Sequence, residues 1–173
     1  MHAALDVLKG SQLTVAIEHL FAHQQFITLV AGWIYNEFWL NKPGYSVDTF
    51  ENLLRQANNS ERIPLSLVAL RDGHPLGTIN LIQCDSERRP HLFPWLAALY
   101  VDQPHRSKKV GSLLVTRLVA DAKRLGYKEL FLGTDIPSFY SQFGASVYEQ
   151  FEDKLCIMRI DLTANGQPKY TST

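Results

Sequence analysis

Residues 99–114 read LYVDQPHRSKKVGSLL, and this run passes from an apolar segment through a short basic turn into a helical pattern. The apolar residues of 94–101 predict a strand, whereas the spacing of apolar residues over 109–125 predicts an amphipathic helix. The start of a helix presents unpaired backbone N–H groups and the positive end of the helix dipole, which together attract a phosphate group. The turn adds four basic side chains: His105, Arg106, Lys108 and Lys109. The sequence therefore predicts that a phosphorylated ligand binds at this junction.

Composition places the chain among compact globular proteins. Its 173 residues are 46% hydrophobic and 20% charged, which suits a single domain over 1–173 with a loosely held tail at 163–173. Seventeen basic residues balance seventeen acidic ones, so neither nucleic acid nor a membrane surface is an expected partner, while a homodimer is compatible with the sequence. Cys84 and Cys156 are too few for a disulfide framework, and no signal peptide or spanning segment is evident. We therefore expect a cytoplasmic protein.

The remaining segments alternate between strand and helix patterns. Strands are expected at 13–17, 63–70, 76–83, 94–101, 129–133, 145–149 and 154–162, and helices at 23–40, 48–58, 109–125 and 137–143. Asp72-Gly73 is typical of a tight hairpin, so the strands on either side of it are expected to be antiparallel neighbours. The order predicts an α/β (α+β) fold with a mixed, mostly antiparallel sheet of about seven strands and helices on both faces.

Two separated motifs resemble those of the GNAT superfamily of acyl-CoA-dependent N-acyltransferases. After Leu99-Tyr100-Val101, residues 106–111 read RSKKVG, where the family shows (Gln/Arg)-x-x-Gly-x-(Gly/Ala). About thirty residues further on, Phe139-Tyr140 and Gly144 match the family pattern Phe-Tyr-x-x-x-Gly. The resemblance covers residues 64–162 well and the first sixty in outline. It implies an N-acetyltransferase that uses acetyl-CoA as co-substrate.

The resemblance also implies which residues hold the coenzyme. The pyrophosphate is expected at Arg106, Ser107, Lys108, Lys109, Val110, Gly111 and Ser112, and the pantetheine arm along Leu99, Tyr100 and Val101. Two positions depart from the family pattern. Ser107 and Lys109 stand where the family often has glycine, a residue that lets the backbone approach the pyrophosphate with no Cβ in the way.

Direct attack of an amine on a thioester needs one proton removed from nitrogen and one delivered to the departing thiolate. Tyr140 is the candidate for the second transfer, because a phenol can donate to a thiolate; the alternative is a core tyrosine. The base stays open, since Ala97 and Ala98 stand where many relatives have a carboxylate. The candidates are Glu37, Asp85, Glu87, His91 and a chain of water molecules.

The aromatic segment 33–39 has two interpretations, a core cluster or the wall of an acceptor pocket. In the second, Trp33 and Glu37 bind the acceptor, with Asp85 contributing from a later loop. Acidic groups slightly favour a cationic amine, such as a polyamine, an aminoglycoside, an amino acid or a peptide N-terminus.

Other kinds of site lack their motifs. No Walker A sequence or nucleophile motif is present, and His19 and His23, four residues apart, have no acidic motif beside them. No metal is therefore expected. Two alternatives to the acetyltransferase stay open: a catalytically degenerate acyl-CoA-binding sensor or interaction module, and a protein that binds ATP or NAD at the same helix start.

Overall fold

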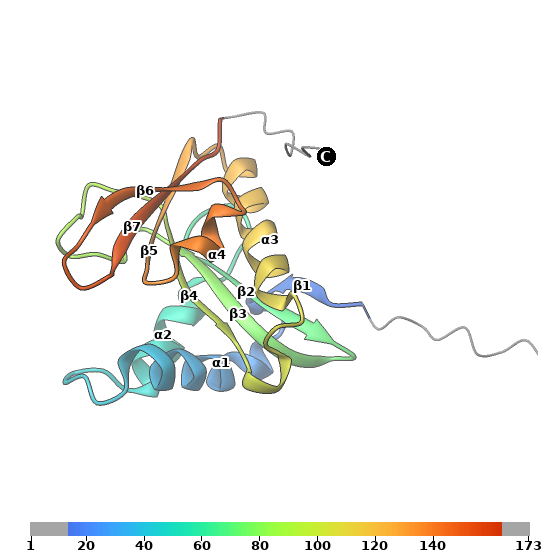
Figure 1. Ribbon diagram of the computed structural model, residues 1–173. Coiled ribbons are helices and arrows are strands. Elements are labelled where there is room, and N and C mark those ends of the chain that lie inside the picture. Colours follow the sequence, from blue (N-terminus) through green and yellow to red (C-terminus); the bar gives the residue numbers. More distant parts are fainter. Residues whose placement is uncertain (1–13, 164–173) are drawn as a thin grey trace, which may run out of the picture.

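The computed structural model describes residues 14–163 (Figure 1). In this part of the chain, seven strands form one sheet: β1 (Ala16–His19), β2 (Leu65–Arg71), β3 (His74–Ile82), β4 (Trp95–Val101), β5 (Glu129–Thr134), β6 (Ala145–Gln150) and β7 (Cys156–Asp161). The helices are α1 (Ile27–Ile34), α2 (Val47–Gln56), α3 (Val110–Arg124) and α4 (Pro137–Ser141). Short 3₁₀ turns η1 (Leu20–Ala22), η2 (Gln24–Phe26) and η4 (Gln103–His105) and a π-helical turn η3 (Tyr35–Trp39) connect them. The tail expected beyond Thr163 lies outside the described residues.

The sheet is mixed and mostly antiparallel, as predicted. Its strand order is β1-β2-β3-β4-β5-β7-β6, which places β4 at the centre. Every neighbouring pair is antiparallel except β4 and β5, which are parallel. The β2–β3 pair is closed by the predicted turn at Asp72-Gly73, where both residues have the positive φ angles that such hairpins require.

Helices cover both faces of the sheet, with α1 and α2 on one side and α3 and α4 on the other (Figure 1). The alternation of side chains along β2 explains this arrangement. Leu67 and Ala69 belong to the core beneath α3, whereas Val68 and Leu70 belong to the core beneath α1 and α2. Because β2 is apolar on both faces, each face needs its own helical cover.

The sheet opens at its centre. β4 and β5 pair only at Trp95 and Phe131, where the Phe131 N–H donates to the Pro94 carbonyl at 2.9 Å. Beyond this point the two strands separate. On its other side, β4 carries a β-bulge opposite Ile79, and Ala98 within it has a φ of 49°. The β4 backbone from the bulge onward is therefore unpaired on the β5 side.

One predicted element near the N-terminus, the first strand, is wrong in its extent. The first strand runs over Ala16–His19 rather than 13–17, and residue 13 lies outside the described residues. The helix expected over 23–40 is present as one uninterrupted helical run over 24–39, which begins as η2, continues as α1 and ends in the π-helical turn η3. His23 lies just before this run, outside the helical region (φ −131°, ψ 52°), and its imidazole pairs with Glu18. In α2, Leu53 is 50% exposed, whereas Phe50 and Leu54 are buried.

The other helices begin and end close to the predicted residues. Ser46 caps α2 through a capping box with Thr49, and Gly126, at a φ of 86°, follows the end of α3. No helix within residues 14–163 has the length and apolar character needed to cross a bilayer.

Candidate active site

A cavity of about 560 Å³ lies where β4 passes into α3, and we call it the α3 cavity. It is lined by Glu37, Leu99, Tyr100, Val101, His105, Arg106, Ser107, Lys109, Val110, Gly111, Ser112, Ile136, Phe139 and Tyr140. Nine of the ten residues predicted to hold the coenzyme are in this lining. Lys108 is outside it and exposed. The structure thus brings the strand, the basic turn and α4 around one space.

The turn before α3 has a backbone suited to anions. Ser107 and Lys109 have φ angles of 61° and 64°, so the two positions where the family often has glycine are both left-handed. Left-handed residues alternating with right-handed ones turn successive N–H groups into a common concavity. The N–H groups of Val110, Gly111 and Ser112 follow in the first turn of α3, where no preceding helical carbonyl can accept them.

Arg106 is held along the cavity wall. Its Nε donates to the Val101 carbonyl at 2.8 Å, and its guanidinium carbon lies 5.4 Å from the centre of the Tyr100 ring. One terminal nitrogen lies 3.7 Å from a carboxylate oxygen of Glu37. Both charged side chains are nearly half exposed, so this ion pair is weak and the guanidinium can exchange it for an anionic ligand.

Trp33 packs against this wall. Its ring contacts the ring of Tyr100, with centres 5.3 Å apart, and it lies outside the lining of the α3 cavity. Glu37 belongs to the α3 cavity beside Arg106. Asp85 lines a different cavity, described below, and Trp33 lines neither cavity. The sequence predicted one acceptor site that contains Trp33, Glu37 and Asp85, whereas the structure places these residues apart.

Tyr140 reaches the α3 cavity from α4 and is buried. The ring of Phe139 lies edge-on to it at 4.9 Å between centres. Burial, with a further contribution from the Asp135 carboxylate, raises the pKa of Tyr140 to about 12. The phenol therefore stays protonated at neutral pH and can donate a hydrogen bond to a negative charge formed beside it.

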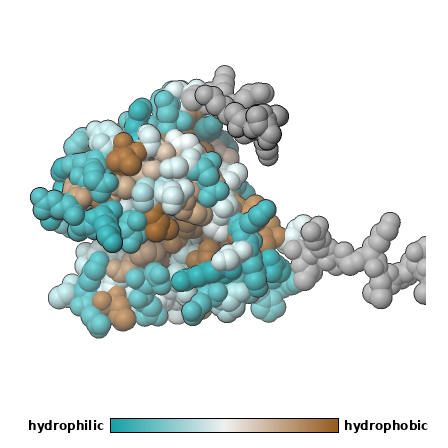
Figure 2. All heavy atoms as spheres, viewed as in Figure 1, coloured by the Kyte–Doolittle hydropathy of each residue, from teal (hydrophilic) through white to brown (hydrophobic). Residues whose placement is uncertain are grey.

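A second cavity, of about 390 Å³, lies on the other side of the β4 bulge, and we call it the aromatic cavity. Its lining is Ile34, Trp39, Tyr45, Phe50, Leu53, Leu54, Ala57, Pro64, Leu65, Asn80, Ile82, Cys84, Asp85, Ser86, Glu87, Ala97 and Ala98. Figure 2 shows apolar residues gathered in a hollow between the α1–α2 layer and the part of the sheet formed by β5, β6 and β7.

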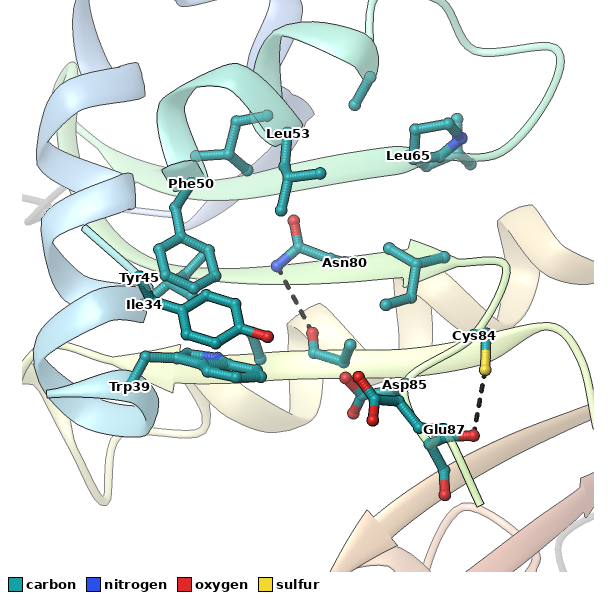
Figure 3. Close-up of a pocket in the computed structure, with 17 residues that line it drawn as sticks. Ile34, Trp39, Tyr45, Phe50, Leu53, Leu65, Asn80, Cys84, Asp85 and Glu87 are labelled. Carbon is teal, nitrogen blue, oxygen red and sulfur yellow. Dashed lines mark hydrogen bonds between the residues drawn. The ribbon is translucent and has the colours of Figure 1, made fainter. Parts of the chain in front are cut away.

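Polar groups occupy one end of the aromatic cavity (Figure 3). The Asn80 amide donates to the Ala97 carbonyl at 3.5 Å, and the carboxylates of Asp85 and Glu87 lie near the same stretch of β4. Desolvation by the surrounding atoms raises the pKa of Asp85 to about 6 although the residue still reaches solvent, and the Lys42 ammonium opposes this shift.

Sequence reasoning missed most of this second cavity. Tyr45, Phe50 and Asn80 were not predicted as site residues, and Trp39 was considered only as part of an aromatic segment. One signal was available for Asn80, which interrupts the apolar run of β3 with an amide that the structure buries. Of the base candidates, Asp85 and Glu87 line the cavity, whereas His91 is exposed and lies outside it.

The chain belongs to the acetyltransferase (GNAT) family, because the sequence model of that family matches residues 32–145. This range contains β4, the basic turn, α3 and Tyr140. The family resemblance and the mixed sheet expected from the sequence are thereby confirmed. No match was found among curated protein sequences.

Solved structures share the fold. YncA of Salmonella typhimurium, solved with its cofactor acetyl-CoA, is 18% identical with a TM-score of 0.66, over 91% of this chain and 99% of that one. The PaiA N-acetyltransferase of Thermoplasma acidophilum, in complex with coenzyme A, is 22% identical with a TM-score of 0.62, over 86% and 99%. An aminoglycoside 6'-N-acetyltransferase complexed with coenzyme A is 14% identical with a TM-score of 0.66, over 88% and 99%.

Proposed function

We propose that this protein is an N-acetyltransferase that transfers the acetyl group of acetyl-CoA to a primary amine by direct attack in a ternary complex. The observation that carries the proposal is the α3 cavity, in which amide donors, basic side chains, an unpaired strand edge and a protonated tyrosine face one space. Relatives of the same fold were solved with acetyl-CoA or coenzyme A, which supports the choice of co-substrate.

The residues of the cavity fit this coenzyme. The N–H groups of Val110–Ser112, together with Arg106 and Lys109, supply the donors and positive charge that a pyrophosphate needs. The edge of β4 at 99–101, which β5 leaves unpaired and where the Val101 carbonyl already accepts from Arg106, can hydrogen-bond the amide-containing pantetheine arm as an added strand would. The arm would then run from the turn toward the bulge at Ala98.

Acetyl-CoA supplies the thioester, whose carbonyl carbon forms a bond to the amine nitrogen while its bond to sulfur breaks. Tyr140 donates a hydrogen bond to the departing sulfur and stabilises the thiolate as it forms. The phenol keeps its proton, since its pKa is about 12 and that of a thiol is ordinarily about 8.5, and the thiolate is protonated from solvent. An amine bound as an ammonium loses one proton before attack and a second as the amide forms, and Asp85 and Glu87 lie in the neighbouring cavity to pass these protons to water.

The proposal is tested by measuring thiol release from acetyl-CoA across a panel of primary amines, with CoA binding followed by calorimetry. We expect release with at least one amine, and loss of CoA binding in Gly111→Glu, whose added carboxylate would project beside the basic turn. Gly111→Ala is the folding control, because a Cβ there meets Phe139 and Val101 at 3.5 and 3.7 Å, ordinary contact distances.

Two results would change the assignment. CoA binding without thiol release for any amine would favour the non-catalytic acyl-CoA binder. A preference for ATP or NAD over CoA in the same titration would show that the α3 cavity serves a different ligand.

A further inference from the structure

The aromatic cavity is chemically divided. Its polar lining residues all come from β3 and the loop that follows it, and they include Asn80, Asp85 and Glu87. The rest of the lining is apolar or aromatic and comes from the helical layer, the segments joined to it and β4. A ligand that fills this space therefore needs one polar end and one apolar body.

Three rings form the apolar end. The ring centres of Trp39 and Tyr45 are 4.2 Å apart, those of Trp39 and Phe50 are 5.7 Å apart, and those of Tyr45 and Phe50 are 6.2 Å apart. Figure 3 shows these rings packed together, with the Tyr45 hydroxyl directed into the cavity. Leu53 extends the apolar surface and is half exposed. This surface suits an aromatic or branched aliphatic group, with the Tyr45 hydroxyl as one polar contact among the rings.

The polar end favours a positive charge. Asp85 and Glu87 are both carboxylates, and the charged group that acts on Asp85 from the helical side is the Lys42 ammonium. With both carboxylates ionised, their two negative charges exceed the single positive charge of Lys42, so this end of the cavity carries a net negative charge. Lys42 also lies 4.4 Å from the centre of the Trp39 ring, so the indole of this site already has an ammonium over its face.

The volume admits a small amine. At about 390 Å³ the cavity falls within the range of roughly 300–1,000 Å³ for ligand pockets. That space is large enough for a phenyl-sized body with a short amine-bearing arm. A multi-ring amino sugar would place many hydroxyl groups against the rings of Trp39 and Phe50, where the Tyr45 hydroxyl and the Trp39 indole N–H are the side-chain polar groups within reach.

We infer that the acceptor is a compact monoamine with an aromatic or branched aliphatic body, bound with its ammonium at Asp85 and Glu87 and its body against Trp39, Tyr45 and Phe50. This inference rests on the proposed function, since it assigns the aromatic cavity to the acceptor. The arrangement also places the nitrogen beside Ala97 and Ala98, where the two cavities approach each other along β4.

Binding to the enzyme–CoA complex tests this inference without requiring turnover. Calorimetry would compare phenethylamine with 2-phenylethanol, which has the same body and no charge, and with spermidine, which has the charge and no apolar body. We expect phenethylamine to bind at least about tenfold more tightly than either, because each competitor lacks one of the two contacts.

Two variants locate the contacts. Asp85→Asn is expected to weaken phenethylamine about tenfold or more, with Asp153→Asn, on the exposed β6–β7 turn, as the matched control. Leu53→Ser is expected to weaken it about threefold, with Leu29→Ser as control, since Leu29 is a similarly exposed helical leucine outside the cavity.

Failure of this inference and failure of the proposed function give different experimental results. The acceptor assignment would be overturned if spermidine bound as tightly as phenethylamine. It would also be overturned if Asp85→Asn bound phenethylamine with unchanged affinity, even where thiol release is observed. Phenethylamine bound as expected with no thiol release would leave the acceptor site standing and refute catalysis instead.

Discussion

Ala98 and Leu99 are consecutive residues of β4, yet Ala98 lines the aromatic cavity and Leu99 lines the α3 cavity. Successive residues of a strand face opposite sides of a sheet, so Ala98 packs in the core beneath α1 and α2 and Leu99 in the core beneath α3. Ala98 has a φ of 49°, a left-handed conformation that turns the strand out of regular pleating opposite Ile79. The bulge lets the consecutive residues Ala97 and Ala98 both line the aromatic cavity, and Leu99 then lines the α3 cavity, so the two cavities meet along one stretch of β4.

Ala98→Val is predicted to destabilise the protein. A β-branched side chain is strongly disfavoured at positive φ, so the free energy of unfolding should fall by about 1–2 kcal/mol, measured by urea denaturation. Ala98→Gly is the matched control and should change it by less than about 1 kcal/mol, since relief of strain offsets the added chain entropy. Equal stability of the valine variant and the wild type would contradict the bulge geometry.

Ser107→Gly and Lys109→Gly are each predicted to raise the free energy of unfolding by about 0.5–1 kcal/mol, because both remove a Cβ from a left-handed position. Only Lys109→Gly also removes a positive charge from the α3 cavity. We therefore expect Lys109→Gly alone to weaken CoA binding, by a few-fold at low salt and less at high salt.

Calorimetry at two salt concentrations distinguishes the contributions of charge and shape at Lys109. Tighter CoA binding by Lys109→Gly would mean that the lysine Cβ hinders the pyrophosphate more than its charge attracts it. Unchanged stability in both glycine variants would mean that the turn is not strained.

The α3 cavity could be predicted because its parts are local in the sequence. A strand, a turn and a helix follow each other within residues 94–125, and the basic side chains lie in the turn itself. Tyr140 was predicted as a site residue because Phe139-Tyr140 and Gly144 match a second family pattern about thirty residues after the first. The sequence did not show that Ser107 and Lys109 have positive φ angles. It did show that both stand where the family often has glycine, the residue that most readily adopts such angles.

The aromatic cavity could not be predicted in the same way, because its residues come from distant segments. Trp39 is placed by a π-helical turn, Asn80 by the β2–β3 register, and Asp85 by a loop with no periodicity. The bulge at Ala98 also had no local signal, since alanine is ordinary in a strand and glycine is the residue that usually marks positive φ. Each of these features depends on tertiary packing.

Tyr140→Phe is predicted to lower kcat by about 100-fold while leaving the Kd for CoA unchanged, because it removes the hydrogen-bond donor to the forming thiolate and keeps the ring. Since the pKa of Tyr140 is about 12, the wild type should show no loss of rate from this group between pH 7 and 10. Tyr127→Phe, a partly buried tyrosine outside both cavities, is the control. An unchanged kcat in Tyr140→Phe would make Tyr140 a packing residue.

Asp85→Asn is predicted to stabilise the protein at neutral and alkaline pH. The pKa of Asp85 is about 6 in the folded protein and 3.8 ordinarily, so between these values the folded protein holds a proton that the unfolded chain has lost. The wild type therefore loses stability as the pH rises from about 4 to about 6, and this loss stays constant above pH 6. Asparagine has no such loss, because it does not ionise.

The expected difference in Tm between Asp85→Asn and the wild type is near zero at pH 3.5 and about 2 °C at pH 8, a modest value because solvent reaching Asp85 screens its charge. Thermal denaturation at the two pH values measures it, with Asp153→Asn as a control that should show no pH-dependent change. A Tm difference that is the same at both values would mean that Asp85 is not desolvated. A variant that is more stable yet binds phenethylamine less well would show that the carboxylate is kept for ligand binding at a cost in stability.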